Sequence, residues 1–214
     1  MIGFALCHGW SYDARAMAAL QAALQQRLPQ ARYASFDLGY GGQPHHPALS
    51  HDVHWIALGH SWGFAWLLQQ AQPWRAAISL NGFTRFCRLP SRSEGTPLRL
   101  LDAMLARLQT EPDATVQDFR QRCGTLPTPE NPLDQALLSA HLTRLCDLDI
   151  TLPSLPLLAL HTSADAIVSP ALTHACFHQT GVALQEFSGD HTHLLREPAI
   201  AADAIAVFVE ALDA

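Results

Sequence analysis

The chain has 214 residues, of which 49% are hydrophobic and 15% are charged. This balance is typical of a globular domain and excludes an intrinsically disordered chain. The formal net charge of −6 gives no reason to expect a nucleic-acid partner, and no apolar stretch approaches the ~20 residues of a membrane-spanning helix, so we expect no membrane association.

Strands and helices alternate along most of the chain. Apolar runs predict six strands: Ile2–Cys7, Ala31–Phe36, Val53–Leu58, Ala76–Leu80, Leu157–His161 and Val182–Phe187. Helical spacing of apolar residues predicts helices over Ala14–Leu28, Trp62–Gln70, Pro170–Phe177 and Pro198–Leu212. This alternation predicts an α/β fold, with a mostly parallel sheet of about six strands and helices on both faces.

The segment from Phe83 to Ile150 interrupts this alternation. It contains no convincing strand, and its spacing predicts three helices: Leu98–Leu108, Thr115–Arg122 and Leu133–Leu145. Because the strand pattern resumes afterwards, we expect residues 83–150 to form a helical cap. The cap would be inserted into a single core domain made of residues 1–82 and 151–214.

The five cysteines are odd in number and include no CxxC pair, so a disulfide framework or a zinc knuckle is not expected. The apolar run at the start of the chain has no basic lead-in and does not resemble a secretory signal. A cytoplasmic location is the simplest expectation.

The strongest chemical signal is Gly59-His60-Ser61-Trp62-Gly63, which lies between the third predicted strand and a helix. In a G-x-S-x-G motif at such a turn, the glycines let strand and helix pack closely and the serine hydroxyl is held exposed. The helix N-terminus adds backbone N–H groups and a positive dipole that favour a developing oxyanion. The pattern predicts Ser61 as a nucleophile, with an ordinary turn into a helix as the alternative.

A serine nucleophile needs a base and an acid that orients the base. Asp165 follows the fifth strand, and the loop at the carboxyl end of a strand is where such an acid would lie. Its alternative role is that of a turn or N-cap residue. His191 and His193 both follow the sixth strand, and from the spacing alone either could reach Ser61.

These motifs, in the order Ser, Asp, His, resemble those of the α/β-hydrolase superfamily, a family of serine esterases and related enzymes. In that family a proline follows the catalytic histidine by seven residues. Here Pro198 matches that proline, so the resemblance selects His191 and makes His193 a pocket-lining or surface residue.

His8-Gly9-Trp10 follows the first strand and is similar to the family's H-G-x segment, whose third residue donates one N–H to the oxyanion. The resemblance implies an oxyanion hole formed by the backbone N–H groups of Trp10 and Trp62. Two donors matter because the loss of one costs about 3 kcal/mol of transition-state stabilisation.

Within the superfamily, the chain resembles the pimeloyl-[acyl-carrier protein] methyl ester esterases of biotin synthesis. The resemblance rests on the segment 8–10, the motif 59–63 and the cap stretch Leu105–Arg122. It implies hydrolysis of a carboxylic ester, with acyl-carrier protein as a partner and no cofactor. The alternatives are a generic carboxylesterase or thioesterase of the same fold, and a non-catalytic binding protein.

The same resemblance implies candidate substrate-binding residues in the cap. Arg120 is the best match to an arginine that grips the acidic carrier protein, and Arg99 and Arg122 are further candidates. Phe83 and Phe119 are candidates for lining an acyl channel. The alternative for the arginines is that they only solvate exposed helix faces.

Histidine is abundant, with twelve residues in the chain. Four of them, at positions 45, 46, 51 and 54, cluster in a proline-rich loop, but their spacing matches no zinc signature. Asp190, His191 and His193 could also contribute to a metal site, but the G-x-S-x-G motif favours a serine mechanism. The sequence therefore predicts no metal.

Overall fold

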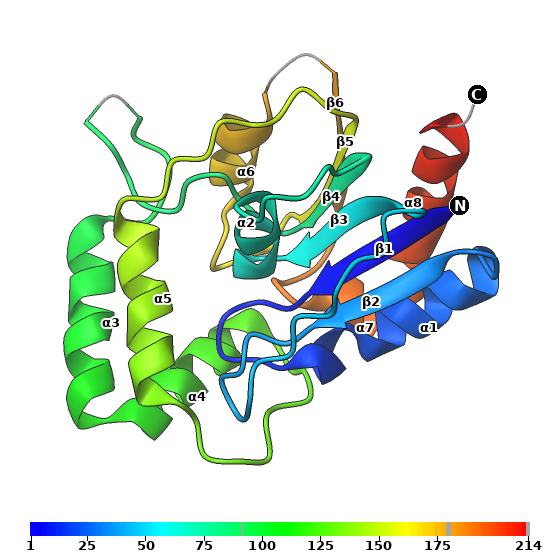
Figure 1. Ribbon diagram of the computed structural model, residues 1–214. Coiled ribbons are helices and arrows are strands. Elements are labelled where there is room, and N and C mark those ends of the chain that lie inside the picture. Colours follow the sequence, from blue (N-terminus) through cyan, green and yellow to red (C-terminus); the bar gives the residue numbers. More distant parts are fainter. Residues whose placement is uncertain (91, 179–180, 213–214) are drawn as a thin grey trace.

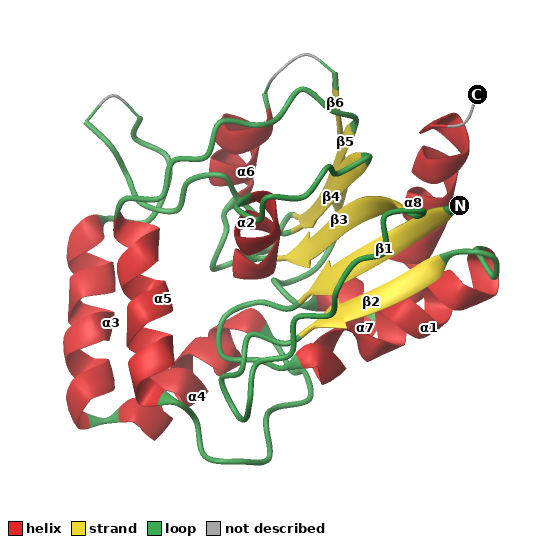
Figure 2. Ribbon diagram, viewed as in Figure 1, coloured by secondary structure: helices red, strands yellow, loops and turns green. Residues whose placement is uncertain are grey.

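The computed structural model describes residues 1–90, 92–178 and 181–212. Its centre is one sheet of six parallel strands in the order β2-β1-β3-β4-β5-β6, with helices on both faces (Figures 1 and 2). The strands are β1 (Ile2–Cys7), β2 (Arg32–Phe36), β3 (His54–His60), β4 (Ala76–Leu80), β5 (Leu157–Thr162) and β6 (Val182–Phe187). The predicted α/β class is confirmed, and every strand pair is parallel.

Each predicted helix is present, although several bounds differ by up to three residues, as for the helix predicted to begin at Thr115, and two local features were not expected. The helices are η1 (Ala14–Met17), α1 (Ala18–Arg27), α2 (Trp62–Leu68), α3 (Leu98–Thr110), α4 (Pro112–Cys123), α5 (Gln135–Cys146), α6 (Pro170–Phe177), α7 (His193–Arg196) and α8 (Pro198–Leu212). The helix predicted over 14–28 is divided into η1, whose first turn is capped by the Asp13 side chain, and α1. The four-residue helix α7 was not predicted, because a single turn carries too little periodicity.

Alternating strand side chains build two cores, one on each face of the sheet. On one face, Phe4 packs with Leu20 of α1 and Ile205 of α8. On the other face the strands present smaller residues such as Ala5 toward a core that includes Phe64 of α2. Small side chains on this face let α2 lie close to the strands, and that close approach positions the turn between β3 and α2.

Helix α8 is the longest helix of the described chain, with 15 residues, and it packs against α1 on the outside of the sheet. Its buried residues Ala201, Ile205 and Val209 recur at helical spacing and face the core. Among the described residues, no helix is both long and apolar enough to cross a bilayer.

Residues 83–150, which the sequence predicts to form a cap and which keep that name below, lie between β4 and β5. A backbone hydrogen bond from Ile150 N–H to the Thr84 oxygen (2.9 Å) brings the two ends of the cap together. Helices α3, α4 and α5 lie beyond the end of the sheet toward which the strands point (Figure 2). Pro112 at the first turn of α4 and the Asp134 side chain, which caps α5, fix where these helices begin. The cap thus covers the carboxyl edge of the sheet.

Candidate active site

Ser61 lies on a strained turn between β3 and α2. Its backbone has φ 53° and ψ −124°, a conformation that non-glycine residues rarely adopt. A Cβ at Gly59 would lie 2.3 Å from the backbone of Phe64, and one at Gly63 would lie 2.4 Å from the oxygen of Cys7. The tight turn therefore requires both glycines of the motif, and it holds the Ser61 side chain at the carboxyl edge of the sheet.

Asp165 and His191 form a buried pair. The Nδ1 of His191 lies 2.7 Å from the Oδ2 of Asp165, and both side chains are almost completely buried. The other carboxylate oxygen, Oδ1, accepts hydrogen bonds from the backbone N–H groups of Ile167 (2.7 Å) and Val168 (2.8 Å). Burial alone would raise the pKa of Asp165, but His191 and these hydrogen bonds lower it below its ordinary value. The carboxylate thus stays ionised and fixes the imidazole with Nε2 unengaged.

The structure brings His191, and not His193, to Asp165. His193 is the first residue of α7 and makes no side-chain hydrogen bond within the described residues. Asp190 is also engaged elsewhere, because Arg196 donates to both of its oxygens, at 2.9 and 3.0 Å. Burial would raise the pKa of Asp190, but Arg196 and the Thr192 N–H lower it.

Ser61 and His191 do not hydrogen-bond to each other in the described chain. The Ser61 Oγ has no hydrogen-bond partner there, and neither has the Nε2 of His191. The two residues are linked through His60, the neighbour of Ser61, whose ring centroid lies 4.7 Å from that of His191. Nucleophile–base hydrogen bonds are commonly long without substrate and tighten when it binds.

His60 positions the main chain of His191, a role that its place in the motif does not reveal. Its Nε2 lies 2.9 Å from the His191 backbone oxygen and must donate, because a carbonyl only accepts. Burial lowers the pKa of His60 to about 3, with a further contribution from His191. A neutral, Nε2-protonated His60 therefore holds the loop that carries His191.

Asn81, directly after β4, is a second residue that sequence reasoning missed. Its Nδ2 donates to the Oδ2 of Asp165 (2.7 Å) and to the Oγ1 of Thr162 (2.6 Å). Its backbone φ is 47°, a region that asparagine tolerates better than most residues. A buried amide thus shares the carboxylate oxygen that His191 uses and fixes its position.

The backbone N–H groups of Trp10 and Trp62 have no acceptor within the described chain. The peptide before Trp10 is held by His8, whose Nδ1 lies 2.9 Å from the Gly9 oxygen. The Leu38 N–H donates to the other ring nitrogen of His8 (3.0 Å), so Nδ1 carries the proton. Gly9 lies next to Ser61, since a Cβ there would be 3.2 Å from the Ser61 Cβ. The two free donors are thus on segments that flank the serine.

A cavity of about 270 Å³ opens at Ser61, beneath the cap. Its walls are formed by residues that include Trp10, Trp62 and three of the predicted substrate-binding residues, Phe83, Phe119 and Arg122. Its other lining residues are Phe86, Gly95, Thr96, Pro97, Leu100, Leu101, Met104, Leu142, Leu145, Ala166, Ile167, Ser169 and Leu172. An apolar chamber of this kind accommodates an apolar group attached to the reacting bond.

Arg99 and Arg120, also predicted to bind substrate, do not line this cavity. Arg99 is exposed on α3. Arg120 faces the core domain, where it donates to the backbone oxygen and the Oγ of Ser11, and its guanidinium lies 5.5 Å from the ring centre of Tyr12. Arg120 therefore joins the cap to the loop after β1.

The histidines at positions 45, 46, 51 and 54 do not form a metal-ligand group within the described residues. His46 instead packs against Phe36 and Trp66. Among the described residues, the group whose possible ligand atoms lie close together consists of His161, His174 and Glu186, outside the cavity. The sequence gives little sign of it, because the three residues are far apart along the chain.

Comparisons of the sequence with protein-family models and with curated proteins give no match. Solved structures, however, share the fold. An esterase from Exiguobacterium antarcticum is 16% identical with a TM-score of 0.80, covering 98% of this chain and 92% of that one. A bromoperoxidase from Bacillus anthracis is 14% identical with a TM-score of 0.73, with the same coverage. BioG from Haemophilus influenzae is 20% identical with a TM-score of 0.61, covering 91% and 90%. These likenesses confirm, at the level of fold, the resemblance to α/β-hydrolases.

Proposed function

Because the chain has the α/β-hydrolase fold, we propose that it is a serine hydrolase that cleaves carboxylic esters. Ser61 is the nucleophile, His191 the general base, and Asp165 the acid that orients His191. The observation that carries the proposal is the buried Asp165–His191 pair at the sheet edge where the turn presents Ser61. The esterase among the structural neighbours supports the same reaction class.

The proposed reaction has two halves, acylation and deacylation of Ser61, and each passes through a tetrahedral intermediate. The Nε2 of His191 takes the Ser61 proton as Oγ attacks the ester carbonyl, and the N–H groups of Trp10 and Trp62 stabilise the oxyanion. His191 then protonates the leaving alcohol, which leaves an acyl-enzyme. Water, deprotonated by His191, attacks this acyl group, and His191 returns the proton to the Ser61 Oγ as the bond between Oγ and the acyl carbon breaks and the acid leaves. Asp165 stabilises the transient imidazolium throughout.

The lining of the cavity supports the proposal that the substrate has an apolar acyl chain. Phe83 and Phe119 line it, whereas Arg122 is exposed and stands at its rim, where its Nη2 lies 3.3 Å from the Ala166 oxygen. Together with the sequence resemblance described above, these features support the finer proposal that the substrate is the methyl ester of pimeloyl-acyl-carrier protein. The acyl chain would occupy the cavity and the carrier protein would contact the outside of the cap.

A fluorophosphonate probe tests the reaction class, because it labels only an activated serine. We expect stoichiometric labelling of the wild-type chain and none of Ser61→Ala. Ser169→Ala is the matched control, since Ser169 lines the same cavity but caps α6 through Leu172 N–H. Labelling that persists in Ser61→Ala, or that is absent from the wild type under conditions where it is folded, would reject the serine mechanism.

Two measurements test the finer proposal. The chain should restore growth without biotin to a strain that lacks this esterase, and Ser61→Ala should not. The purified protein should hydrolyse pimeloyl-carrier-protein methyl ester with a higher kcat/KM than the free methyl ester. Equal rates on both, with no restored growth, would indicate a carboxylesterase for other substrates.

A further inference from the structure

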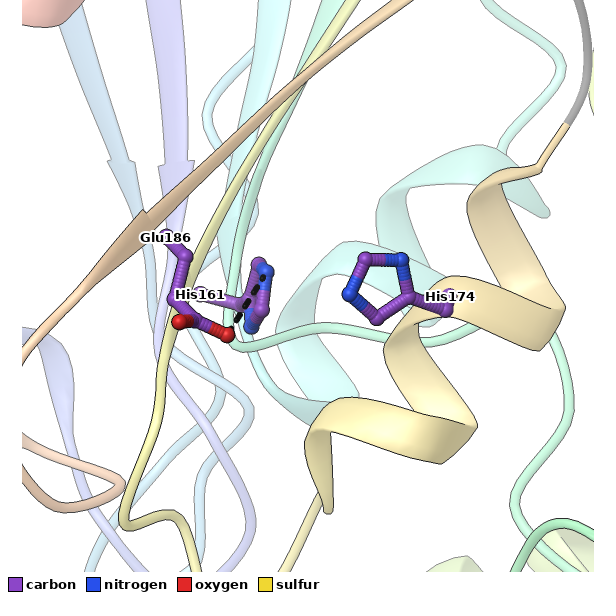
Figure 3. Close-up of side chains that lie close together, drawn as sticks. All are labelled: His161, His174 and Glu186. Carbon is purple, nitrogen blue, oxygen red and sulfur yellow. Dashed lines mark ion pairs between the residues drawn. The ribbon is translucent and has the colours of Figure 1, made fainter.

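His161, His174 and Glu186 meet on the face of the sheet that α6 covers (Figure 3). His161 is on β5, and the strand register pairs it with Glu186 on the edge strand β6. His174 projects from α6 toward the His161 ring, and the two ring centroids are 5.3 Å apart. One donor atom from each of the three side chains lies within 4.8 Å of the other two.

His161 is buried without the hydrogen bonds that an imidazole needs. The residue is 2% exposed, and neither Nδ1 nor Nε2 has a hydrogen-bond partner in the described chain. The closest charged group, the Oε2 of Glu186, lies 3.8 Å from Nε2, which is beyond hydrogen-bond range. Buried polar atoms are almost always paired, and this unpartnered imidazole lies between a second imidazole and a carboxylate, which are both groups that bind metal ions.

We propose that these three side chains form a binding site for a divalent transition-metal ion, with Zn²⁺ as the best match. Two imidazoles and one carboxylate are a donor set that suits Zn²⁺ and related ions, whereas Mg²⁺ and Ca²⁺ prefer oxygen ligands. Three protein ligands leave a fourth tetrahedral position for water.

The distances allow this coordination after small side-chain movements. Tetrahedral ligands at ~2.0–2.1 Å from Zn²⁺ are about 3.4 Å from one another. The present separations of up to 4.8 Å must therefore shrink by about 1.4 Å at most. His174 and Glu186 are exposed and can change rotamer, while buried His161 supplies the fixed ligand.

The site is separate from the proposed serine chemistry. None of its residues lines the cavity at Ser61, but a bound ion would tie β5, β6 and α6 together. These elements flank the loop of Asp165, which begins after β5 and ends where α6 starts. The ion would thus stabilise the support of the proposed active site without contacting substrate.

Titration calorimetry of the chelator-treated full chain with zinc chloride tests the proposal. We expect one high-affinity ion per chain, and no binding of Mg²⁺. His174→Ala and Glu186→Gln should each weaken Zn²⁺ binding at least about 100-fold, since even residues that only support a metal ligand cost 10–100-fold. His178→Ala is the matched control, because His178 is exposed directly after α6 and outside the group.

A second measurement uses the linkage of binding to stability. Zinc should raise the Tm of the wild type and of His178→Ala, and should not raise that of His174→Ala. Absence of saturable zinc binding would overturn the proposal. So would binding that survives both His174→Ala and Glu186→Gln, or that His178→Ala weakens equally.

Discussion

The indole Nε1 of Trp10 donates a hydrogen bond to the backbone oxygen of Leu138, at a distance of 3.0 Å. Trp10 also carries one of the two unpaired backbone N–H groups beside Ser61, and Leu138 is a buried residue of α5 in the cap. The ring of Phe119, on α4, packs edge-on against the same indole at 4.9 Å. The position of a proposed oxyanion donor is therefore set by the cap as well as by the loop after β1.

Trp10→Phe tests this coupling. The backbone N–H remains, but the hydrogen bond to Leu138 is lost, so the donor can move relative to the oxyanion. Because misplacement by about 1 Å can cost 10²-fold, we expect kcat/KM on short p-nitrophenyl esters to fall about 10- to 100-fold. Trp55→Phe, which removes an exposed indole hydrogen bond to Ser50, should leave the rate unchanged. An unaltered rate in Trp10→Phe would refute the coupling.

Asn81→Asp should impair the proposed acid. The change removes the N–H donor to Asp165 and places a second carboxyl group 2.7 Å from the first, which raises the pKa of the pair. We expect kcat/KM to fall about 100-fold and the acidic limb of its pH profile to move to higher pH. Asn131→Asp, on an exposed cap loop, is the control. A lower rate with an unmoved pH profile would make Asn81 merely structural.

The strain at Ser61 has a measurable cost in stability. Ser61→Ala and Ser61→Gly both remove the hydroxyl, but only glycine adopts φ 53°, ψ −124° readily. Such backbone strain costs about 1–3 kcal/mol, so Ser61→Gly should be about 1 kcal/mol more stable to unfolding than Ser61→Ala. For a chain of this size, that is about 2–4 °C in Tm. Greater stability of Ser61→Ala would show that the turn is relaxed.

These predictions involve residues of two kinds, those that sequence reasoning found and those that it missed. Ser61 and Asp165 were proposed because each follows a strand, and strand ends are readable from apolar runs, whereas the choice of His191 over His193 needed the family resemblance and its Pro198. Asn81 also follows a strand, but its contact with Asp165 depends on a positive φ that no periodicity reports. His60 was missed because its partner is a backbone oxygen 131 residues away along the chain.

The bounds of the helices and strands also divide into those that local sequence signals reveal and those that they do not. The bounds of β4 and α6 match their predictions, because apolar runs and N-terminal prolines or serines mark them locally. The predicted start of α5 at Leu133 was two residues early, since the side chain of Asp134 caps the helix. The family resemblance led us to expect Arg120 at a surface that binds a carrier protein. The structure instead places its guanidinium against Tyr12 and Ser11, and a resemblance in sequence does not reveal these contacts.

Acidification should destabilise the fold through buried histidines. Burial lowers the pKa of His60 to about 3 and that of His141 to about 4, whereas the pKa of a histidine in the unfolded chain is about 6.5. Between these values the unfolded chain binds more protons, so the stability present above pH ~6.5 is lost as pH falls. Each histidine contributes about 1.4 kcal/mol per pH unit in this window.

Urea unfolding at pH 7.5 and 5.5 measures this loss. We expect the free energy of unfolding to drop by roughly 3 kcal/mol from the two histidines together. His141→Gln retains a polar partner for Tyr40, whose hydroxyl lies 2.7 Å from the His141 Nδ1, and should remove about half of the drop. A pH dependence identical in wild type and His141→Gln would show that His141 titrates normally in the folded chain.

The arginines of the cap should separate into two classes if a carrier protein is the partner. Arg99 and Arg122 are exposed, so their reversal to glutamate should weaken turnover of the carrier-bound ester more than turnover of small free esters. Exposed charge pairs contribute about 1 kcal/mol or less, so each reversal should cost a few-fold and the double reversal about tenfold. Added salt should reduce the wild-type preference for the carrier-bound ester.

Arg120→Glu should behave differently, because Arg120 holds Ser11 and Tyr12 beside the loop of Trp10. Its reversal should slow both substrates alike, through displacement of the proposed oxyanion donor. Arg27→Glu, on α1 and paired with Asp203 far from the cap, is the control for a change of net charge. A double reversal of Arg99 and Arg122 that leaves turnover of the carrier-bound ester intact would reject this surface as the carrier site, because the approach of an acidic partner depends on the charge it meets.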